Sequence, residues 1–506
     1  MVVKARIVRH KGVRFRSAPL AKHISYLERD GVTRDGRDGA LFDARGNEAD
    51  GDAFASRCED DRHHFRFIVS PEDADLGDLR RFTRELLSDM EKDLGTRLDW
   101  VAIDHWNTDN PHVHILVRGT ADDGSDLVID RGYVSEGIRF RAEERVTLEL
   151  GPRSEREVQR ARELEIEAER WTALDRELAG RAAQNGGLVD LRPEPASEDA
   201  GARHLRGRVA KLEKLGLAVT AAPGIWLIDA RAEEALRDLS VRGDIIKTMH
   251  RAMGRSGARL DPAAMALHAE APDEPIVGRL VDRGLHDELA GSAYAIVDGT
   301  DGRTHHLRFD DLALTGDAPP GAIVELRRWE DNKGLAVHSL AVRSDLSLAD
   351  QVGARGATWL DRQLIARDPA STGNGFGLEV RHAMDARSIW LERQGLARRQ
   401  GPRLVAAPGL IDTLRAQDLA EAVAAIADRT GLPHAPAAAG EAVRGIYRER
   451  VTLASGRFAM IDDGLGFQLV PWRPALDAHL GRAVAGSLKT GGGIDWAVGR
   501  SRGIGL

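Results

Sequence analysis

Residues 104–118 read Asp-His-Trp-Asn-Thr-Asp-Asn-Pro-His-Val-His-Ile-Leu-Val-Arg, and this stretch decides how the amino-terminal part of the chain folds. Strand-forming sequence on either side, at residues 98–105 and 112–118, encloses six residues that are rich in Asn, Asp and Pro. These residue types favour tight turns, because their side chains or fixed backbone angles stabilise a chain reversal. The pattern therefore predicts a β-hairpin.

Three histidines converge on one face of this predicted hairpin. His105 and His112 flank the loop and lie opposite each other, with Cβ atoms about 5 Å apart. His114 projects from the same face as His112, because side chains alternate along a strand. Three neutral imidazoles can hold a divalent cation and leave coordination positions open, which is typical of a catalytic metal site. Zn²⁺ suits three imidazoles and Mg²⁺ or Mn²⁺ suits a phosphate substrate, so the sequence leaves the metal open.

The flanking sequence predicts further elements of the same domain. Residues 63–70 alternate between two sets of side chains and predict a strand. Residues 76–94 carry apolar side chains at helical spacing and end before Gly95, so they predict a helix that packs on the sheet. Residues 1 to about 120 are therefore expected to form a mixed α/β unit.

The first 27 residues form a basic arm that contains no carboxylate. We expect its cationic side chains to face phosphate groups, although the whole chain, with 72 Lys and Arg against 80 Asp and Glu, has a net charge of −8. Arginine greatly outnumbers lysine in the chain. Arginine suits paired contacts with phosphate, and the codon usage of a GC-rich genome explains the same excess. The arm residues assigned to DNA binding are Lys4, Arg6, Arg9, Lys11, Arg14 and Arg16.

Tyr26 lies beside this arm and is the candidate nucleophile. The aliphatic side chains of residues 20–27 form a narrow stripe in helical projection, and Tyr26 lies about 120° from its centre. We therefore expect an exposed phenol, a pattern that an ordinary surface tyrosine also shows. A phenol can attack a phosphodiester when a metal ion polarises a non-bridging oxygen, and the product is a covalent phosphotyrosine.

The sequence after this domain predicts a helical extension and a linker. Ser154 and Glu157 have the spacing of a capping box, and an apolar stripe at residues 158–178 follows. The polar segment 184–202, with Asn-Gly-Gly and Pro-Glu-Pro, is the expected linker.

An internal repeat follows the linker. Two pairs of segments match: residues 212–218 (LEKLGLA) with 391–397 (LERQGLA), and residues 221–225 (AAPGI) with 406–410 (AAPGL). Each copy predicts a helix, a tight turn and two strands, which resembles a DNA-binding winged helix; a plain interaction module is the alternative. Strand-rich segments follow at residues 293–299 and 458–464, where we expect small β-barrels.

The composition excludes several classes of protein. A chain of 506 residues with 42% hydrophobic and 30% charged residues is expected to fold as several globular domains, and it is neither collagen-like nor mostly disordered. No apolar run approaches the roughly 18 residues that a membrane span needs, so we expect no membrane insertion. The start lacks the pattern of a secretory signal, and Cys58 is the only cysteine. These features predict a cytoplasmic protein without structural disulfides.

The motifs together resemble one enzyme family. His105 with His112-Val-His114 is similar to the metal triad of HUH endonucleases, and specifically of conjugative relaxases, the mobilization nucleases. Residues 67–72 (FIVSPE) resemble the second relaxase motif, and residues 23–31 (HISYLERDG) resemble the first, which supplies the nucleophilic tyrosine. The three motifs stand in family order, and the resemblance covers residues 1 to about 150.

The resemblance implies both a fold and an activity. The fold is a twisted antiparallel sheet with helices on one face and with the metal and Tyr26 on its open face. The activity is nicking of one DNA strand at the transfer origin of a plasmid, followed by a 5′-phosphotyrosine link and export through a type IV secretion channel. Implied partners are single-stranded DNA, origin duplex DNA, accessory relaxosome proteins and the secretion coupling protein. The expected DNA contacts also include Arg66 just before the second motif, Ser70 within it, and Arg118, where the family commonly has Asn.

One position departs from the family pattern. The commoner motif has Asp two residues after the first histidine, where this chain has Asn107, and an amide cannot accept a proton as a carboxylate does. Asp104 or Asp109 could act as the general base instead, and the sequence leaves this choice open.

Two other functions fit the same sequence. A rolling-circle replication initiator would use the same chemistry, although the chain has no Walker motif. A non-catalytic DNA-binding regulator or accessory transfer protein would bind through the winged-helix repeats alone, and the three aligned ligands argue against it.

The predicted fold class is α+β, with seven segments along the chain. They are a relaxase (HUH nickase) domain at residues 1–150, a helical extension at 151–183, a linker at 184–202, a winged-helix-like module at 203–270, a β-barrel-like module at 271–345, a second winged-helix-like module at 346–440, and a second β module with a Gly-rich tail at 441–506.

Overall fold

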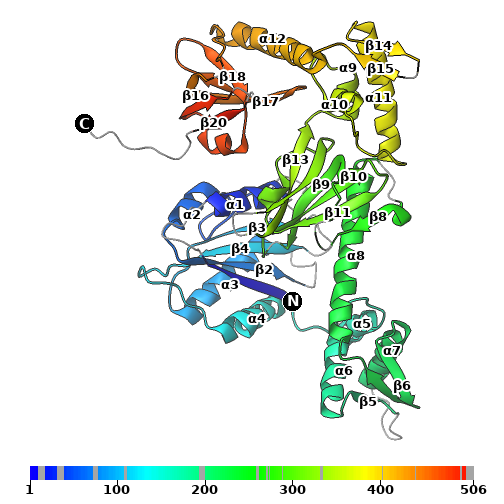
Figure 1. Cartoon of the computed structure of the whole chain (residues 1–506). Coiled ribbons are helices and arrows are strands. Elements are labelled where there is room, and N and C mark those ends of the chain that lie inside the picture. The colour runs from blue at the N-terminus through cyan, green and yellow to red at the C-terminus, as the bar shows by residue number, and fades with distance from the viewer. Residues whose placement is uncertain are drawn as a thin grey trace. The chain divides into compact units, whose positions relative to one another are not determined.

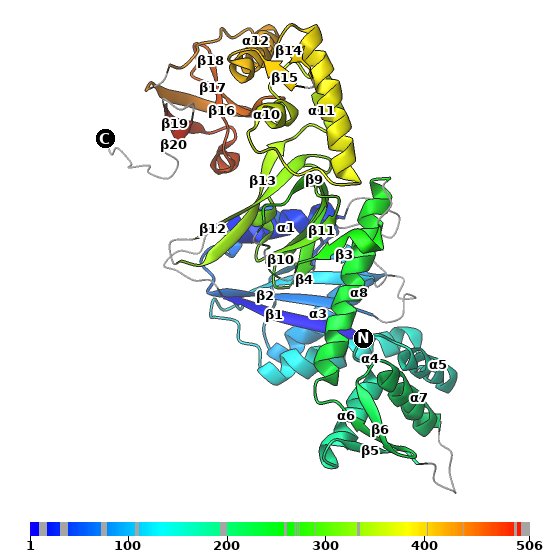
Figure 2. The ribbon, with the colours of Figure 1, turned by 45° about the vertical axis from the view of Figure 1, so that its right-hand side comes forward.

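The structure is a computed structural model. It describes residues 1–9, 18–30, 39–71, 78–106, 111–192, 200–257, 261–268, 270, 272, 274–287, 289–330, 334–401, 403–438, 440–489 and 493–496. The chain divides into two compact units, the first comprising residues 1–246 with 287–291 and the second residues 247–286 with 292–506. Figures 1 and 2 label the elements in chain order. No helix in the described part of the chain combines the length and the apolar character needed to cross a bilayer.

A four-stranded antiparallel sheet in the order β1-β2-β4-β3 organises the amino-terminal domain. Its elements are β1 (Val2–Arg9), α1 (Ala18–Asp30), α2 (Gly51–Arg57), β2 (His63–Ser70), α3 (Leu79–Leu94), β3 (Trp100–His105), β4 (His112–Arg118), the π-helix η1 (Tyr133–Gly137) and α4 (Ile138–Leu150). The predicted strand, helix and hairpin are confirmed. Helices α3 and α4 lie on one face of the sheet and α1 lies on the other (Figure 1), so helices are not confined to one face as expected.

The apolar face of this sheet carries the core of the domain. Phe65, Phe67 and Val69 share one face of β2 and pack against α3, where Phe82 is also buried. Removing such a side chain from water stabilises the fold by about 1.5–3 kcal/mol. Helix α3 ends at Gly95, whose left-handed φ of 67° closes the last turn as the sequence predicts.

A helical segment follows the amino-terminal domain. Its elements are α5 (Glu155–Ile166), α6 (Ala173–Gln184), β5 (Leu188–Asp190), α7 (Ala200–Lys214), β6 (Ala218–Ala222), β7 (Ile225–Ile228) and α8 (Ala232–Arg255). The capping box of Ser154 with Glu157 is confirmed. The expected continuous apolar stripe is wrong, because two helices share it and Leu164 is 73% exposed. The predicted linker contains β5, which pairs with β7.

The second unit is built on a six-stranded and a five-stranded sheet, with helices and a two-stranded hairpin between them in the chain. Its further elements are η2 (Pro262–Ala264), β8 (Met265–Leu267), β9 (Val277–Asp287), β10 (Ser292–Gly299), β11 (Thr304–Phe309), η3 (Leu312–Thr315), β12 (Ile323–Glu330), β13 (Ala336–Ser344), α9 (Leu348–Gly353), α10 (Trp359–Ile365), α11 (Phe376–Arg393), β14 (Ala397–Gln400), β15 (Arg403–Ala406), α12 (Leu410–Thr430), β16 (Ala442–Leu453), β17 (Gly456–Asp462), β18 (Phe467–Pro471), η4 (Pro474–His479), β19 (Ala483–Leu488) and β20 (Ile494–Trp496). The six-stranded and the five-stranded sheet are open along the described strands, so the expected small β-barrels are wrong.

The chain contains a duplication that is more extensive than the short sequence match. The strand order β13-β12-β9-β10-β11 of the first sheet is repeated as β20-β19-β16-β17-β18 in the second. The sixth strand, β8, runs parallel to β11, and its counterpart is the single parallel bridge between His434 and Phe467 at the start of β18. Before each sheet stand two helices, a third helix, a hairpin and a long helix: α5, α6, α7, β6–β7 and α8 in the first copy, and α9, α10, α11, β14–β15 and α12 in the second.

The two halves of the sequence match differ in their structural meaning. Residues 212–218 and 391–397 both end a helix, turn and start a strand, so this match is a true equivalence. Residues 221–225 form the turn of the β6–β7 hairpin, whereas residues 406–410 lead from β15 into α12. The AAPG similarity is therefore a coincidence of turn-forming residues, and β7 corresponds to β15 instead.

Each copy also contains the same buried ion pair. Arg208 on α7 and Asp175 at the start of α6 are fully buried and joined by Nε–H···Oδ1 and Nη2–H···Oδ2 hydrogen bonds of 2.8 and 2.9 Å. Arg387 on α11 and Asp361 on α10 repeat both bonds at the same distances. In both copies the guanidinium also donates to backbone carbonyls of the segment before the acidic helix, so it ties three parts of the copy together.

Candidate metal centre

The register of the β3–β4 hairpin places three histidines on one face of the sheet. His105 pairs directly with His112, and His114 pairs with Ile103, two residues before His105 on the same face of β3. The intervening residues of β4, Val113 and Ile115, point into the apolar core on the other side. The convergence predicted from strand alternation is therefore confirmed.

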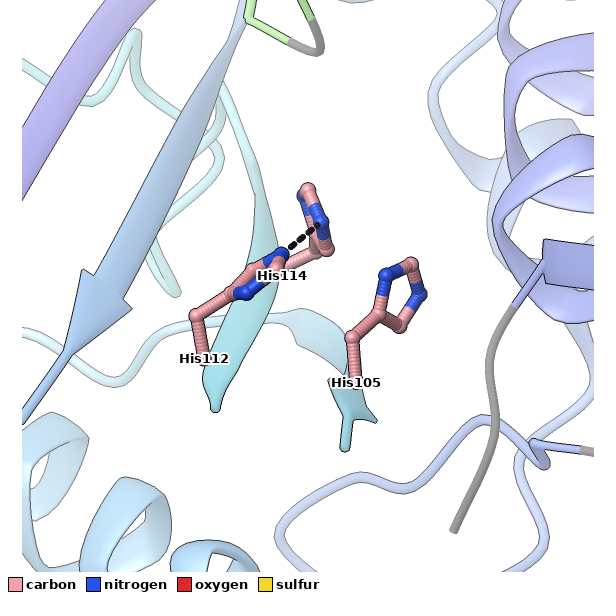
Figure 3. Close-up of side chains that lie close together, drawn as sticks. All are labelled: His105, His112 and His114. Atoms are coloured by element: carbon pink, nitrogen blue, oxygen red, sulfur yellow. Dashed lines mark hydrogen bonds between the residues drawn. The ribbon is translucent and has the colours of Figure 1, made fainter. Parts of the chain in front are cut away.

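The three imidazole rings lie close enough to share one ion (Figure 3). The Nε2 atoms of His112 and His114 are 3.1 Å apart, and one nitrogen of each ring lies within 4.8 Å of the others. The ring centroid of His105 lies 5.3 Å from that of His112 and 4.6 Å from that of His114. The side chains are 3–8% exposed, so the ligands are buried rather than presented on an open face.

The donor set is chemically suited to a divalent cation. Imidazole nitrogen binds Zn²⁺ and other first-row ions well, and three such ligands leave one or more positions for a substrate oxygen. Among the described residues this is the one group of three or more metal-ligand side chains that lies close enough to hold an ion. These residues can therefore hold a metal ion.

Asp104 precedes the first histidine and serves the other side of the sheet. Its Oδ1 accepts a 2.8 Å hydrogen bond from Nε of Arg80 on α3, and its Oδ2 accepts a 2.7 Å bond from the indole of Trp106. Both oxygens are thus engaged away from the histidine face, and the carboxylate anchors β3 to α3. The other candidate base, Asp109, and Asn107 lie outside the described residues.

The cationic residues of the first two strands are divided between the two faces. Lys4 pairs with Ile68 and Arg6 with Arg66, and Ile68 in turn pairs with His114. Lys4, Arg6 and Arg66 therefore project from the histidine face, where Arg66 donates a 3.0 Å hydrogen bond to His64. Arg9 alternates to the opposite face. Lys11, Arg14 and Arg16 lie outside the described residues.

Two further expected DNA contacts have partners within the protein. The Ser70 hydroxyl donates a 3.1 Å hydrogen bond to the carbonyl of Pro111, immediately before His112, so it fixes the end of the loop. Arg118 forms a bidentate pair with the buried Asp61, at 2.9 and 3.0 Å. Both residues lie on the histidine face by register, and both help to hold the sheet together. No local pattern in the sequence indicates either partner, because both pairs join segments that are far apart in the chain.

Tyr26 is not exposed as the helical projection predicts. It is 5% exposed, and the expected buried stripe of Leu20, Ile24 and Leu27 is 1–2% exposed. The projection assumed that α1 is covered on one side only. Helix α1 contacts both α2 and β3, so a second side of the helix is covered as well. Figure 3 shows that α1 runs on the side of the sheet from which His105 projects.

Comparison with known proteins identifies the carboxy-terminal part of the chain. Residues 205–338 and 328–505 match the family described as "Protein of unknown function (DUF3363)". The chain belongs to the DUF3363 family. The DUF3363 match covers the structure from α7 onward, whereas the three histidines precede it. No curated protein and no solved structure matches the chain.

The DUF3363 region contains a second group of histidines. His306 on β11 is 2% exposed, stacks on Tyr294 with ring centroids 5.5 Å apart, and has no hydrogen-bond partner for Nδ1 among the described residues. Burial, assisted by the nearby His286 and Arg308, lowers the pKa of His306 to about 4. On the other face of β11, His305 lies between Asp301 and His268, at 3.1 and 3.0 Å. His268 and His305 are residue types that bind metal ions, and here they are joined to each other by a hydrogen bond within a packed network.

Proposed function

We propose that this protein is a relaxase, a metal-dependent enzyme that nicks one DNA strand at a transfer origin and remains attached to the 5′ phosphate. The convergence of His105, His112 and His114 on one face of the sheet carries the proposal. Lys4 and Arg6 project from the same face and offer positive charge to a DNA backbone. A triad of this kind beside a cationic strand suits phosphodiester chemistry better than a closed structural site.

The three histidines would hold the metal ion through ring nitrogens. A bound divalent ion supplies Lewis-acid polarisation of the scissile phosphate and lowers the cost of the charge that develops on its oxygens. The chain itself supplies the buried position of the ligands and the anchoring of the strand by Asp104 and Arg80. Arg80 donates a hydrogen bond to the Asp104 carboxylate. The proposal therefore assigns no proton transfer to Asp104, and Asp109 remains the candidate base.

Tyr26 is the proposed nucleophile. Its phenolic oxygen forms a bond to phosphorus, the bond from phosphorus to the 3′ oxygen breaks, the base takes the phenolic proton, and the leaving 3′ oxygen receives a proton. One phosphodiester replaces another, so the linkage can be reversed by a free 3′ hydroxyl. Because Tyr26 is 5% exposed, the proposal requires α1 to shift so that DNA reaches the phenol.

The test is formation of a covalent adduct by the full chain. Single-stranded DNA of random sequence, labelled at the 3′ end, is incubated with the protein and Mn²⁺ and separated under denaturing conditions. Label should migrate with the protein, whereas the same pool labelled at the 5′ end should release free fragments, because the protein joins the 5′ phosphate of the downstream product. EDTA should abolish both signals.

Tyrosine variants make the test specific. Tyr26→Phe should remove the adduct, and Tyr133→Phe is the matched control, because it deletes the hydroxyl of another tyrosine in the same domain, one that bonds Asp93 at 2.7 Å. His114→Ala should also remove the adduct. An adduct that persists in Tyr26→Phe would overturn the nucleophile, and the absence of any adduct in the wild-type protein with every divalent ion tried would overturn the enzymatic proposal.

A further inference from the structure

The two hairpins of the duplication have opposite surface chemistry. The first, β6–β7, belongs to a segment in which residues 215–228 contain no charged side chain. The second, β14–β15, lies in residues 393–411, which contain four arginines and no carboxylate. Both hairpins follow an equivalent helix and precede a long one, although β5 adds a third strand to the first. The first hairpin forms without arginine side chains.

The outer face of the first hairpin is apolar. Val219 pairs with Leu227, which pairs with Leu188 of β5, and these three side chains are 63%, 46% and 40% exposed. The opposite face of this small sheet packs into the core with Trp226 and Val189. A hairpin of this type is thus stable with uncharged residues on its outer face.

The outer face of the second hairpin is cationic. Arg398 pairs with Val405 and Arg403 pairs with Gln400, so the two arginines lie diagonally across the strands on one face, about 7–8 Å apart. Leu404 and Ala406 point the other way into the apolar cluster that α11 and α12 share. Arg398 and Arg403 are exposed, and within the described residues neither pairs with a carboxylate.

Two more arginines extend the positive surface around this hairpin. Arg393 is exposed at the end of α11. Arg399 donates to Glu392 at 3.0 Å, and this pair is 50% and 30% exposed. Arg399 is therefore partly neutralised, which leaves Arg393, Arg398 and Arg403 as the cations that a ligand can use.

We infer that the β14–β15 hairpin binds the phosphate backbone of duplex DNA. This inference rests on the proposed function, which makes DNA the substrate, and it assigns a duplex contact to the DUF3363 region. Guanidinium groups bind phosphate oxygens through paired hydrogen bonds, and the diagonal spacing of Arg398 and Arg403 suits neighbouring phosphates of one strand. Phosphate contacts of this kind position a protein on DNA without reading its sequence.

The same surface fits a duplex better than a single strand. Proteins that bind single-stranded DNA combine positive charge with aromatic side chains on which the bases stack. The outer face of β14–β15 contains Arg398, Gln400, Arg403 and Val405 and no aromatic residue. An acidic protein surface is the competing partner, and the experiment separates the two.

The test measures how binding to a duplex depends on salt. Fluorescence anisotropy measures the affinity of the full chain for a labelled duplex of about 20 base pairs at NaCl concentrations from about 50 to about 300 mM. Each phosphate contact contributes about 0.9 to the slope of log K against log salt concentration. Arg398→Ala/Arg403→Ala should lower the slope by about 1.8 and weaken binding at the lowest salt by roughly tenfold or more.

The matched control removes two exposed arginines from the first copy. Arg231→Ala/Arg237→Ala changes the net charge by the same amount, but Asp229 and Glu233 already neutralise these side chains. The control should keep the wild-type slope. Equal losses of affinity in both variants would show a general charge effect and overturn the inference. Poly-glutamate serves as a model of an acidic protein surface. If Arg398→Ala/Arg403→Ala binds the duplex like the wild-type protein but no longer binds poly-glutamate, the inference is also overturned.

Adduct formation separates this inference from the proposed function. Arg398→Ala/Arg403→Ala should form the covalent adduct with a short single-stranded oligonucleotide as the wild-type protein does. If the wild-type protein forms no adduct but the salt slope still falls in this variant, the duplex contact stands and the nickase is wrong. If adducts form and the slope does not change, the nickase stands and the duplex contact is wrong.

Discussion

The Nε2 atoms of His112 and His114 lie 3.1 Å apart on one face of β4. Strand alternation brings the two side chains to the same face, and their rings turn so that the nitrogens meet rather than diverge. This distance fits an N–H···N hydrogen bond in which one ring carries its proton on Nε2 and the other does not, and the same two nitrogens can bind a cation. His105 adds a third ring from the neighbouring strand, so the three residues can hold one metal ion.

Metal affinity should depend on each ring of the triad. We expect His114→Ala to weaken binding of Mn²⁺ or Zn²⁺ by at least about 100-fold, because the loss of one of three protein ligands is more severe than the 10–100-fold loss caused by outer-shell changes. Isothermal titration calorimetry on the EDTA-treated protein measures the change directly.

The control for this experiment is another histidine of the same sheet. His63 starts β2, points to the other face and contacts the carbonyl of Leu127 at 2.9 Å. His63→Gln should bind metal like the wild-type protein. Equal affinity in His114→Ala and the wild-type protein would show that the metal binds elsewhere.

The sequence allowed the hairpin and its metal face to be predicted because both depend on local rules. Alternation along residues 98–118 fixes which side chains share a face, and turn-forming residues fix where the strand reverses. The engagement of Asp104 by Arg80 could not be predicted in this way, because the two residues come together only when α3 packs on the sheet. The prediction that Tyr26 is exposed is wrong for the same reason, because a helical projection of α1 contains no information about α2 and β3.

The duplication shows where sequence matching succeeds and where it misleads. The LEKLGLA match marks equivalent positions because a helix end, a turn and a strand start place strong demands on residue type. The AAPG match joins two unrelated turns that share only their turn-forming residues. The open sheets could not be distinguished from barrels by sequence, since closure depends on pairing between strands that are far apart in the chain.

Cys58 should be unreactive in the folded protein. Burial, with the nearby Asp61 carboxylate, raises the pKa of its thiol to about 12, whereas an unfolded thiol has a pKa of about 8.5. At pH 8 the folded protein therefore contains roughly 2000-fold less thiolate than the unfolded chain. Alkylation by iodoacetamide, followed by mass spectrometry, should be slower by that order in buffer than in 8 M urea. Rapid labelling in buffer would contradict the packing around α2.

The stability of the second unit should fall in mild acid because of His306. Its pKa is about 4 in the folded protein and 6.5 in the unfolded chain, so the unfolded chain binds a proton first as the pH falls. Stability is therefore complete above pH 6.5 and is lost progressively between pH 6.5 and 4, by up to about 3 kcal/mol. Thermal unfolding at pH 7.5 and pH 5 measures the loss.

A variant that cannot titrate identifies the residue responsible. His306→Phe keeps an aromatic ring on Tyr294 and should show a flatter pH dependence than the wild-type protein. His382→Asn, which changes an exposed histidine on α11, should keep the wild-type dependence. Identical pH profiles for the wild-type protein and His306→Phe would assign the acid sensitivity to another group.

The two buried ion pairs of the duplication should be equally important for stability. Arg208→Met and Arg387→Met each leave a fully buried aspartate without its partner, and breaking such a pair costs about 3–5 kcal/mol. Arg181→Met removes a surface pair with Glu177, in which both side chains are at least 40% exposed, and should cost less than about 1 kcal/mol. Urea unfolding of the full-length variants gives the three values.

The double variant Arg208→Met/Asp175→Leu should recover part of the loss, because no unpaired charge remains buried. If it is instead less stable than Arg208→Met, the capping of α6 by Asp175 and Thr172 contributes more than the ion pair itself.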